Sequence, residues 1–506
     1  MTIDDDAAYQ VLLARDARFD GRLFVGVTST GVYCRPICRV RTPSRRNCRF
    51  FDTPAQAEAA AFRPCLKCRP EIAPGPGLAW TVMDASRTLA VQAAVALDES
   101  AASGEPPAVA ALADRLGVSD RHLRRIFFAE HGVTPLQYLQ TRRLLLAKHL
   151  LTDTRMPIAD IALTSGFRSL RRFNAAFAAG YRMNPTRLRR AAKTRPGQDS
   201  EADAPGDAAP ITVTLGYRAP LDTASLLAFV SQRAIPGVEV VDALAIRRSL
   251  RKGALAMPAA AASPAGWIEA RFAPETSRLR VAFAPALGPC SASLIAAVRR
   301  WLDLDAAPET IDAVLADLPG APGLRLPGSL DGFELAVRAV LGQQVTVAGA
   351  RTLARRVVER FGTFVATPWS DVGRDFPSPE ALASAPIERI AELGIIRSRV
   401  GAIQALAREW PQLAPLIATG AAPERLVERL RDLPGIGAWT AHYVAMRTLG
   451  WPDAFPSGDV AALKAMQRLF ATASLREAEA RAEAWHPWRA YALLRLWNSL
   501  TPGDRS

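Results

Sequence analysis

The stretch LPGIGAWTAHYVAM, Leu433 to Met446, decides how the C-terminal part of this 506-residue chain is expected to fold. A proline and two glycines precede a helical pattern that opens with Trp439. A Pro-Gly-x-Gly turn bends sharply and exposes backbone N–H groups at a helix start, where they can hold a DNA phosphate without reading sequence. Gly435 and Gly437 are required because a Cβ would obstruct the turn or the approach. The stretch therefore indicates a helix-hairpin-helix, and for the four residues of the turn alone a simple glycine-rich loop is the alternative.

Length and charge indicate several domains and a polyanionic partner. A chain of this length is expected to hold three or four domains of roughly 100 to 200 residues each. The net charge of +14 is concentrated at the front, where residues 1–196 contain 30 Lys and Arg against 17 Asp and Glu. Arginine dominates this excess, and its planar guanidinium matches phosphate oxygens, so we expect double-stranded DNA as the partner. A basic surface that only aids solubility is the alternative.

The sequence favours a cytoplasmic protein without membrane contact. No window approaches the ~20 unbroken apolar residues of a membrane span. Residues 1–10 contain three consecutive aspartates where a signal peptide needs a basic start. Six cysteines in a reducing compartment are expected as metal ligands, nucleophiles or core residues rather than disulfides.

Two pairs of cysteines near the N-terminus give a strong metal signal. Cys34 and Cys38 are followed by Cys65 and Cys68. Four soft ligands in two close pairs suit a tetrahedral Zn²⁺, and the spacing alone leaves open whether the zinc is structural. Cys48, between the pairs, is expected to be a bystander because the zinc is already satisfied.

Basic residues crowd both pairs, which predicts that the metal centre lies against DNA phosphates. Those near the first pair are Arg35, Arg39, Arg41, Arg45, Arg46 and Arg49, and those near the second are Arg63, Lys67 and Arg69. A zinc ion with four thiolates carries net negative charge, which makes the sulfurs nucleophilic but repels DNA.

Two helix-turn-helix patterns follow the cysteines. The first, Val109 to Phe127, turns at Gly117 and has Ser119 as the N-cap of its second helix. The second spans Ile158 to Phe177, and a long helix from about Pro135 to Leu151 joins the two. Their second helices are expected to present basic side chains to a major groove: Arg121, Arg124 and Arg125 in the first, and Arg168, Arg171 and Arg172 in the second. A plain helical bundle is the alternative.

The segments TGVYCRPICRVR (Thr30 to Arg41) and FRPCLKCRP (Phe62 to Pro70) resemble the N-terminal domain of the Ada family of alkylation-response proteins. In that family the cysteine that matches Cys34 takes a methyl group irreversibly from a methylated DNA phosphate. The resemblance implies that Cys34 is both ligand and nucleophile. Methylation would remove one negative charge from the zinc centre, so we expect it to weaken repulsion by DNA and act as a binding switch.

The two helix-turn-helix patterns together resemble the AraC-type DNA-binding domain, across about residues 80–190. The run IADIAL followed by Gly166-Phe167 matches the family pattern closely. Members of this family bind promoters and recruit RNA polymerase. The resemblance therefore implies promoter DNA and RNA polymerase as partners.

The opening stretch resembles the helix-hairpin-helix DNA glycosylase superfamily. The runs WHPWRAYALLRLW (Trp485 to Trp497) and LGQQVTVA (Leu341 to Ala348) narrow the resemblance to the AlkA branch, 3-methyladenine DNA glycosylase II, over about residues 211–502. Trp439 stands about where members that also cut the backbone have a catalytic lysine, and no cysteine follows Cys290. Neither a Schiff base nor an iron–sulfur cluster is therefore expected.

Asp459, 22 residues after the second glycine of the hairpin, supplies the carboxylate that this branch needs. An alkylated purine is cationic and leaves readily, so the remaining task is to stabilise the oxocarbenium ion that develops at the sugar. The resemblance implies that Asp459 does this and orients the attacking water; an N-cap of a helix Val460 to Phe470 is compatible. Trp439 and Trp497 are implied to line a pocket for the extruded base. Gln344 occupies the place of the family's usual leucine wedge.

The expected fold is multidomain, mainly α with α+β parts. The segments are a small zinc α/β domain at 1–77, an AraC-type double helix-turn-helix at 78–190, a linker at 191–210, a strand-rich subdomain at 211–300 and a helix-hairpin-helix glycosylase bundle at 301–506. We expect a bacterial, nucleoid-associated, monomeric protein that accepts methyl groups, activates transcription and excises alkylated bases. The alternative is a transcription factor with a structural zinc and a non-catalytic C-terminal scaffold.

Overall fold

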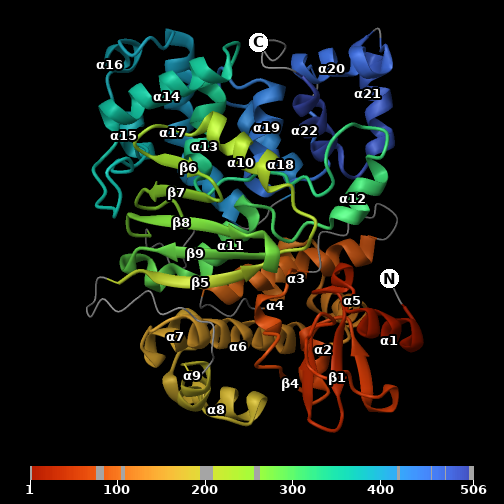
Figure 1. Cartoon of the computed structure of the whole chain (residues 1–506). Helices are drawn as coiled ribbons and strands as arrows, with labels where there is room; N and C mark the ends of the chain where they lie inside the picture. The colour runs from red at the N-terminus through yellow and green to blue at the C-terminus, as the bar shows by residue number, and fades with distance from the viewer. Residues whose placement is uncertain are drawn as a thin grey trace. The chain divides into compact units, whose positions relative to one another are not determined.

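The computed structural model describes residues 3–75, 85–103, 109–193, 209–255, 263–418, 422–456, 458–472 and 474–500. Most of the predicted linker at 191–210, and the predicted boundary between residues 77 and 78, lie outside these ranges. The chain forms two compact units, one from residues 1–219 and 275–296 and the other from residues 220–256, 261–274 and 297–506 (Figure 1). Among the described helices, none has the length and apolarity that a bilayer crossing requires.

The first unit begins with a small sheet, in the strand order β3-β1-β2-β4, where β2 and β4 pair in parallel and the other neighbours are antiparallel. Its core holds Phe24, Tyr33 and Phe62. The elements are α1 (Asp5–Ala14), η1 (Ala17–Phe19), β1 (Phe24–Val27), β2 (Val32–Cys34), η2 (Arg45–Asn47), β3 (Cys48–Phe51), α2 (Pro54–Ala59), β4 (Arg63–Pro64) and η3 (Pro70–Ile72). The sheet places Cys34 at the end of β2.

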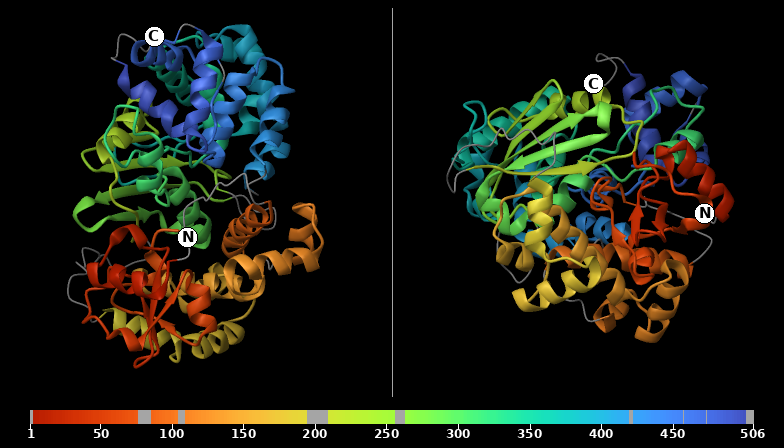
Figure 2. Two further views of the ribbon diagram at one scale, coloured as in Figure 1. Left: turned by 90° about the vertical axis from the view of Figure 1, so that its right-hand side faces the viewer. Right: turned by 60° about the horizontal axis from the view of Figure 1, so that its bottom comes forward.

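Helices continue the first unit and confirm both helix-turn-helix patterns. They are α3 (Ala85–Ser103), α4 (Val109–Arg115), α5 (Asp120–His131), α6 (Pro135–Asp153), α7 (Ile158–Thr164), α8 (Leu170–Tyr181) and α9 (Pro185–Lys193). Ser119 caps α5, and Thr134 with Gln137 forms a capping box at the start of α6. The connecting helix α6 contacts α2 and η3 of the sheet module as well as α7 and α9 (Figures 1 and 2).

A strand pair completes the first unit. Strand β5 (Ile211–Gly216) pairs antiparallel with β9 (Arg278–Phe283), and η5 (Pro285–Cys290) and the start of α11 (Ser291–Trp301) follow. The backbone N–H of Thr214 in β5 donates to the carboxylate of Asp153 at the end of α6, at 2.8 Å. Cys290 is buried and behaves as a small core residue.

The second unit combines three antiparallel strands with a helical bundle. The strands are β6 (Glu239–Asp242), β7 (Ala245–Leu250) and β8 (Gly266–Ala273), followed by the short η4 (Pro274–Thr276). The helices are α10 (Thr223–Arg233), α12 (Pro308–Val314), α13 (Gly332–Leu341), α14 (Val347–Phe361), α15 (Pro379–Ser384), α16 (Ile387–Ala391), α17 (Arg397–Ala418), α18 (Pro423–Arg431), α19 (Ala438–Leu449), α20 (Val460–Phe470), α21 (Leu475–Ala482), η6 (Glu483–Trp485) and α22 (Arg489–Ser499).

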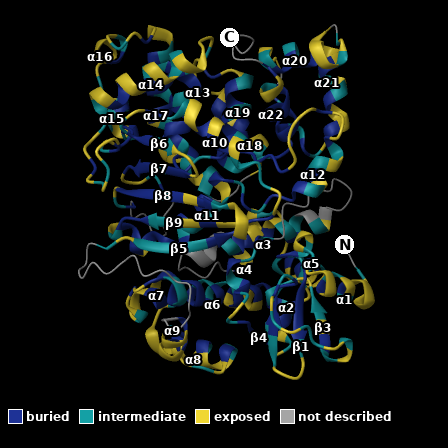
Figure 3. Cartoon of the chain, viewed as in Figure 1, coloured by how far each residue is buried: buried dark blue, intermediate teal, exposed yellow. Residues whose placement is uncertain are grey.

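Two apolar cores hold the bundle together. One joins α13, α14, α17 and α19, and α13 is buried along nearly its whole length (Figure 3). The other joins α19, α20 and α22 and includes Trp485 and Trp488. Because α19 contributes to both cores, the hairpin before it has a rigid support on either side.

Candidate functional site

The predicted hairpin lies between α18 and α19. Gly435 has a φ of +79°, and a Cβ there would lie 2.8 Å from the Cβ of Ala402. Gly437 is the N-cap of α19, and no side chain in the described part of the chain caps this helix start. Both glycines are exposed. The first N–H groups of α19 therefore face outward in the arrangement that binds an anion.

Asp459 is buried, with 7% of its surface exposed, at the N-cap of α20. Its Oδ1 accepts from the backbone N–H of Ala462 at 2.7 Å and from the indole Nε1–H of Trp497 at 3.0 Å. Its Oδ2 accepts from the indole Nε1–H of Trp439 at 2.8 Å. The structure thus brings the carboxylate together with both predicted tryptophans, and Trp439 links it to the hairpin two residues earlier. Helix α20 begins and ends where the sequence predicts.

Tyr443 also belongs to this cluster and packs against both apolar cores of the bundle. Its ring stacks on Trp439, with centroids 5.1 Å apart and planes 7° apart. Its phenol oxygen accepts from Arg447 at 2.6 Å. Burial acts to raise the pKa of Tyr443, but the guanidinium groups of Arg447, Arg233 and Arg338 lower it below the usual value. Tyr443 follows Trp439 by four residues, and this helical spacing indicates that the two rings lie on the same face of α19.

The loop between α13 and α14 lies against the hairpin. Gln344 is exposed and has a φ of +52°, a conformation uncommon for a residue with a side chain. Its neighbour Gln343 donates from Nε2 to the carbonyl of Gly435 at 3.0 Å and to Oγ1 of Thr440 at 3.1 Å. The sequence interpretation did not single out Gln343.

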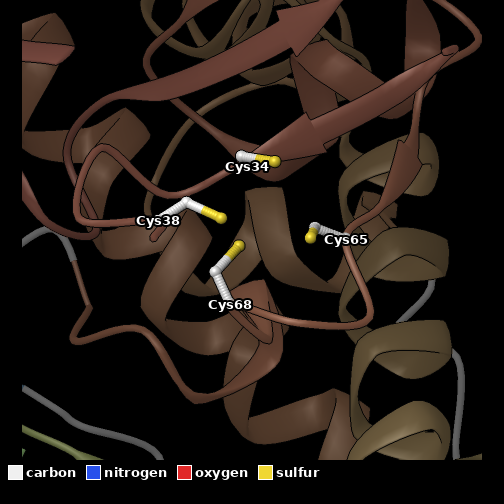
Figure 4. Close-up of side chains that lie close together, drawn as sticks. All are labelled: Cys34, Cys38, Cys65 and Cys68. Atoms are coloured by element: carbon white, nitrogen blue, oxygen red, sulfur yellow. The ribbon is translucent and has the colours of Figure 1, made fainter. Parts of the chain in front are cut away.

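The four predicted ligand cysteines converge in the first unit (Figure 4). The sulfurs of Cys34, Cys38, Cys65 and Cys68 all lie within 4.8 Å of one another, a spacing that can hold one metal ion. Cys48 is buried apart from this cluster, packed with Leu12 and Val25. Hydrogen bonds with Cys38 and the other sulfurs, and then burial, raise the pKa of Cys34. Four such groups cannot all be thiolates at this distance without a cation to offset their repulsion.

Backbone N–H groups distinguish the sulfurs from one another. Cys68 accepts from the N–H of Arg35 at 3.4 Å and Cys65 from the N–H of Lys67 at 3.3 Å. A backbone hydrogen bond from Val40 reaches Cys38. Within the described ranges no backbone N–H is found on the sulfur of Cys34. Hydrogen bonding favours the charged form of the sulfur that accepts it, so the four sulfurs are not equivalent.

Two of the arginines predicted to face phosphates are instead internal. Arg35 is buried and its Nε donates to Asp20 Oδ1 at 2.8 Å. Arg69 is buried and forms ion pairs with Glu71 at 2.9 Å and with Asp153 of α6 at 2.6 Å. The prediction is wrong for both because buried carboxylates, which the local sequence does not reveal, pair with them. Arg41 is exposed as expected, as are Arg39, Arg46, Arg49 and Lys67.

The basic side chains predicted to face a major groove are exposed on the two helix-turn-helix units. Exposed residues are Arg121, Arg124 and Arg125 on α5 and Arg168, Arg171 and Arg172 beside or on α8. Arg124 is partly engaged by Asp120 at 3.0 Å. Phe173 and Phe177 are fully buried, and Phe167 is partly buried.

Four protein families match the chain in succession. "Metal binding domain of Ada" matches residues 7–71 and "Helix-turn-helix domain" matches residues 112–191. "AlkA N-terminal domain" matches residues 212–331, and "HhH-GPD superfamily base excision DNA repair protein" matches residues 337–490. These matches confirm the resemblances inferred from the sequence.

Three curated relatives cover the chain to different extents. A Mycobacterium tuberculosis protein named "Probable bifunctional transcriptional activator/DNA repair enzyme AlkA" is 35% identical over 98% of this chain and 97% of its own length. The DNA-3-methyladenine glycosylase 2 of Escherichia coli is 34% identical over 56% of this chain and 96% of its own length. The bifunctional transcriptional activator/DNA repair enzyme AdaA of Bacillus subtilis is 30% identical over 37% of this chain and 84% of its own length.

Proposed function

Because the chain belongs to the family of bifunctional transcriptional activator/DNA repair enzymes, we propose that its second unit excises alkylated purines such as 3-methyladenine, with Asp459 as the catalytic carboxylate. One observation carries this proposal. The carboxylate of Asp459 accepts hydrogen bonds from two indole N–H groups and from a backbone N–H at the start of α20, beside the exposed hairpin that we expect to bind phosphate. Gly458 directly precedes Asp459 in the sequence, so the residue before the proposed catalytic carboxylate is not a second acid.

Asp459 can still accept one further contact. A carboxylate offers about four lone-pair directions, and three are used by Ala462, Trp439 and Trp497. The remaining direction, on Oδ2, would face the sugar cation or the attacking water as the base departs. Since the donors already hold the carboxylate in place, it stabilises the developing charge without reorganising at the moment of reaction.

The proposed hydrolysis needs no covalent enzyme intermediate. The bond between C1′ and the purine nitrogen breaks, and its electron pair neutralises the cationic base. A water oxygen then bonds to C1′ and loses a proton, for which Asp459 is the acceptor at hand. The faces of Trp439 and Trp497 attract a cationic purine, while their N–H groups are used by the carboxylate.

Substitution of Asp459 by Asn tests the glycosylase proposal. Asn is as good an N-cap as Asp, so α20 should stay folded while the negative charge is lost. We expect release of 3-methyladenine from alkylated DNA to fall by about 10³-fold, with affinity for the same DNA nearly unchanged. Release at the wild-type rate would remove Asp459 from the mechanism.

For the first unit we propose that Cys34, Cys38, Cys65 and Cys68 hold Zn²⁺ and that Cys34 accepts a methyl group from DNA methylphosphotriesters. When bound, Zn²⁺ would keep the four sulfurs as thiolates. The Cys34 sulfur attacks the methyl carbon, a carbon–sulfur bond forms, and the methyl–oxygen bond breaks with its electron pair passing to the phosphate. Among the described residues, backbone N–H donors reach Cys38, Cys65 and Cys68 but not Cys34, and this supports the choice of Cys34.

We further propose that the two helix-turn-helix units bind promoter DNA and recruit RNA polymerase, with affinity raised by methylation of Cys34. The exposed arginines of α5 and α8 support this proposal. At equal salt, methylated protein should bind its promoter more tightly than unmethylated protein in a gel-shift titration. Equal affinities would exclude the switch.

A further inference from the structure

We propose that Gln343 is a positioning residue that locks the Gln344 loop to the phosphate-binding hairpin, so that the two DNA-facing loops of the second unit move as one. The inference rests on the proposed glycosylase function and adds to it the residue that sets the spacing between hairpin and wedge. It starts from the contacts of Gln343 and from the backbone conformation of Gln344.

The chemistry of the contacts fixes the orientation of the Gln343 amide. The carbonyl of Gly435 can only accept, so the amide nitrogen, not its oxygen, must face it. The second hydrogen of that nitrogen goes to Oγ1 of Thr440 in the first turn of α19. Both donor hydrogens are therefore used on the hairpin and on the helix that it starts.

A second contact holds the backbone of the same residue. The carbonyl oxygen of Gln343 accepts from the guanidinium Nη2 of Arg399 in α17. Gln343 is thus connected through its side chain to the hairpin and through its backbone to α17, which packs against α13 in the core. The next residue, Gln344, is held with a φ of +52° and is exposed.

This arrangement has a mechanical consequence for DNA binding. The hairpin grips the backbone by its N–H groups, and whatever fills the space of an extruded base must enter the duplex at a fixed distance from that grip. Gln344 is polar and flexible, so burial of its side chain in the base stack contributes little by itself. The effect of Gln344 on base extrusion therefore depends on its side chain being held at one position relative to the hairpin. The contacts of Gln343 supply that constraint.

Isosteric variants of Gln343 test the inference. Gln343→Met removes both hydrogen bonds without adding charge, and Gln343→Glu places a carboxylate against the Gly435 carbonyl. Gln412→Glu, an exposed residue on α17, is the control for added negative charge. The probes are duplexes with one 7-methylguanine, either paired with cytosine or placed opposite an abasic analogue.

For the paired lesion, we expect both Gln343 variants to lower the single-turnover release rate by about 10-fold. For the lesion opposite the abasic analogue, which is already unpaired, release should change by less than about 2-fold. Affinity for undamaged duplex should stay constant. A variant that merely weakens the fold would lower both rates equally, and equal losses or no loss would overturn the inference.

A binding measurement separates this inference from the glycosylase proposal. A duplex with 2-aminopurine beside a tetrahydrofuran abasic analogue fluoresces more when its stack is opened, and no base release is needed. Wild-type protein should raise the fluorescence, and Gln343→Met should lose most of the increase. If wild type releases no base but this pattern holds, the glycosylase proposal fails and the positioning inference stands. No increase with wild type, or an increase retained in Gln343→Met, overturns the inference.

Discussion

The cysteine cluster and the Asp459 site differ in how their reactive atom is singled out. In the cluster, four cysteine sulfurs of the same chemical type lie within 4.8 Å of one another. At the second site, one carboxylate accepts hydrogen bonds from two indole N–H groups and one backbone N–H. A residue in the cluster cannot be changed without disturbing its partners, whereas Asp459 can be changed to a side chain that keeps its structural role. The first site must therefore be tested by its product and the second by substitution.

The sharpest test of the cluster is the position of the methyl group. After incubation of wild-type protein with DNA containing methylphosphotriesters, mass spectrometry of peptides should find a stoichiometric methyl group on Cys34. Cys34→Ser should abolish uptake completely, and Cys48→Ser, outside the cluster, should leave it intact. A methyl group on Cys38, Cys65 or Cys68 would show that the four sulfurs are not distinguished as proposed.

The two indoles give the corresponding test at Asp459. Trp439→Phe and Trp497→Phe each keep an aromatic face for the base but remove one N–H from the carboxylate. A hydrogen bond to a charged group contributes about 1.5–3 kcal/mol, so each variant should release base at least about 10-fold more slowly in single-turnover assays. Trp369→Phe is the control, because its ring packs on Trp267 of β8 and the indoles that bind Asp459 are those of Trp439 and Trp497. Wild-type rates in both variants would mean that the indoles serve only the base.

The smallest expected effect is on thermal stability, and it comes from the contact between the cysteine-bearing sheet and α6. Glu58 accepts from Tyr33, next to Cys34, at 3.1 Å and from Thr141 of α6 at 3.0 Å. Burial raises the pKa of Glu58 from 4.5 to about 8. The folded form thus binds this proton more tightly than the unfolded form, so its stabilisation is complete below 4.5 and is lost as the pH rises through about 8.

Glu58→Gln should therefore flatten this decline between pH 5 and pH 8, since the amide does not titrate. Melting temperatures from circular dichroism would record the difference, at about 2–4 °C for each kcal/mol. Parallel curves for the variant and wild type would show that the Glu58 carboxyl titrates normally.

Much of the fold follows from local sequence signals. Ser119 and Asp459 are caps followed by helical periodicity, and the helices begin where those residues predict. The four ligand cysteines were identified by spacing. Strand β7 has a weak local signal because two arginines interrupt its apolar alternation. Arg248 is nevertheless buried, because it forms ion pairs with Glu239 and Glu334. Charge pairing between distant segments has no local signature.

The same limit applies to the sites. The sequence suggested tryptophans around a base, but it did not show that both indole N–H groups bind Asp459. Nor did it show that Arg35 and Arg69 turn inward, because their partners lie elsewhere in the chain. Residue types and spacing identify the participants, and the fold determines which atoms meet.

Binding of a cationic sugar analogue tests the role of Asp459 most directly. Two duplexes would be compared, one with a pyrrolidine abasic analogue, protonated at neutral pH, and one with the neutral tetrahydrofuran analogue. Wild-type protein should bind the cationic duplex more tightly, and Asp459→Asn should bind both equally, because the carboxylate stabilises positive charge at the sugar. Equal affinities in wild type, or a preference that survives in Asp459→Asn, would contradict the account.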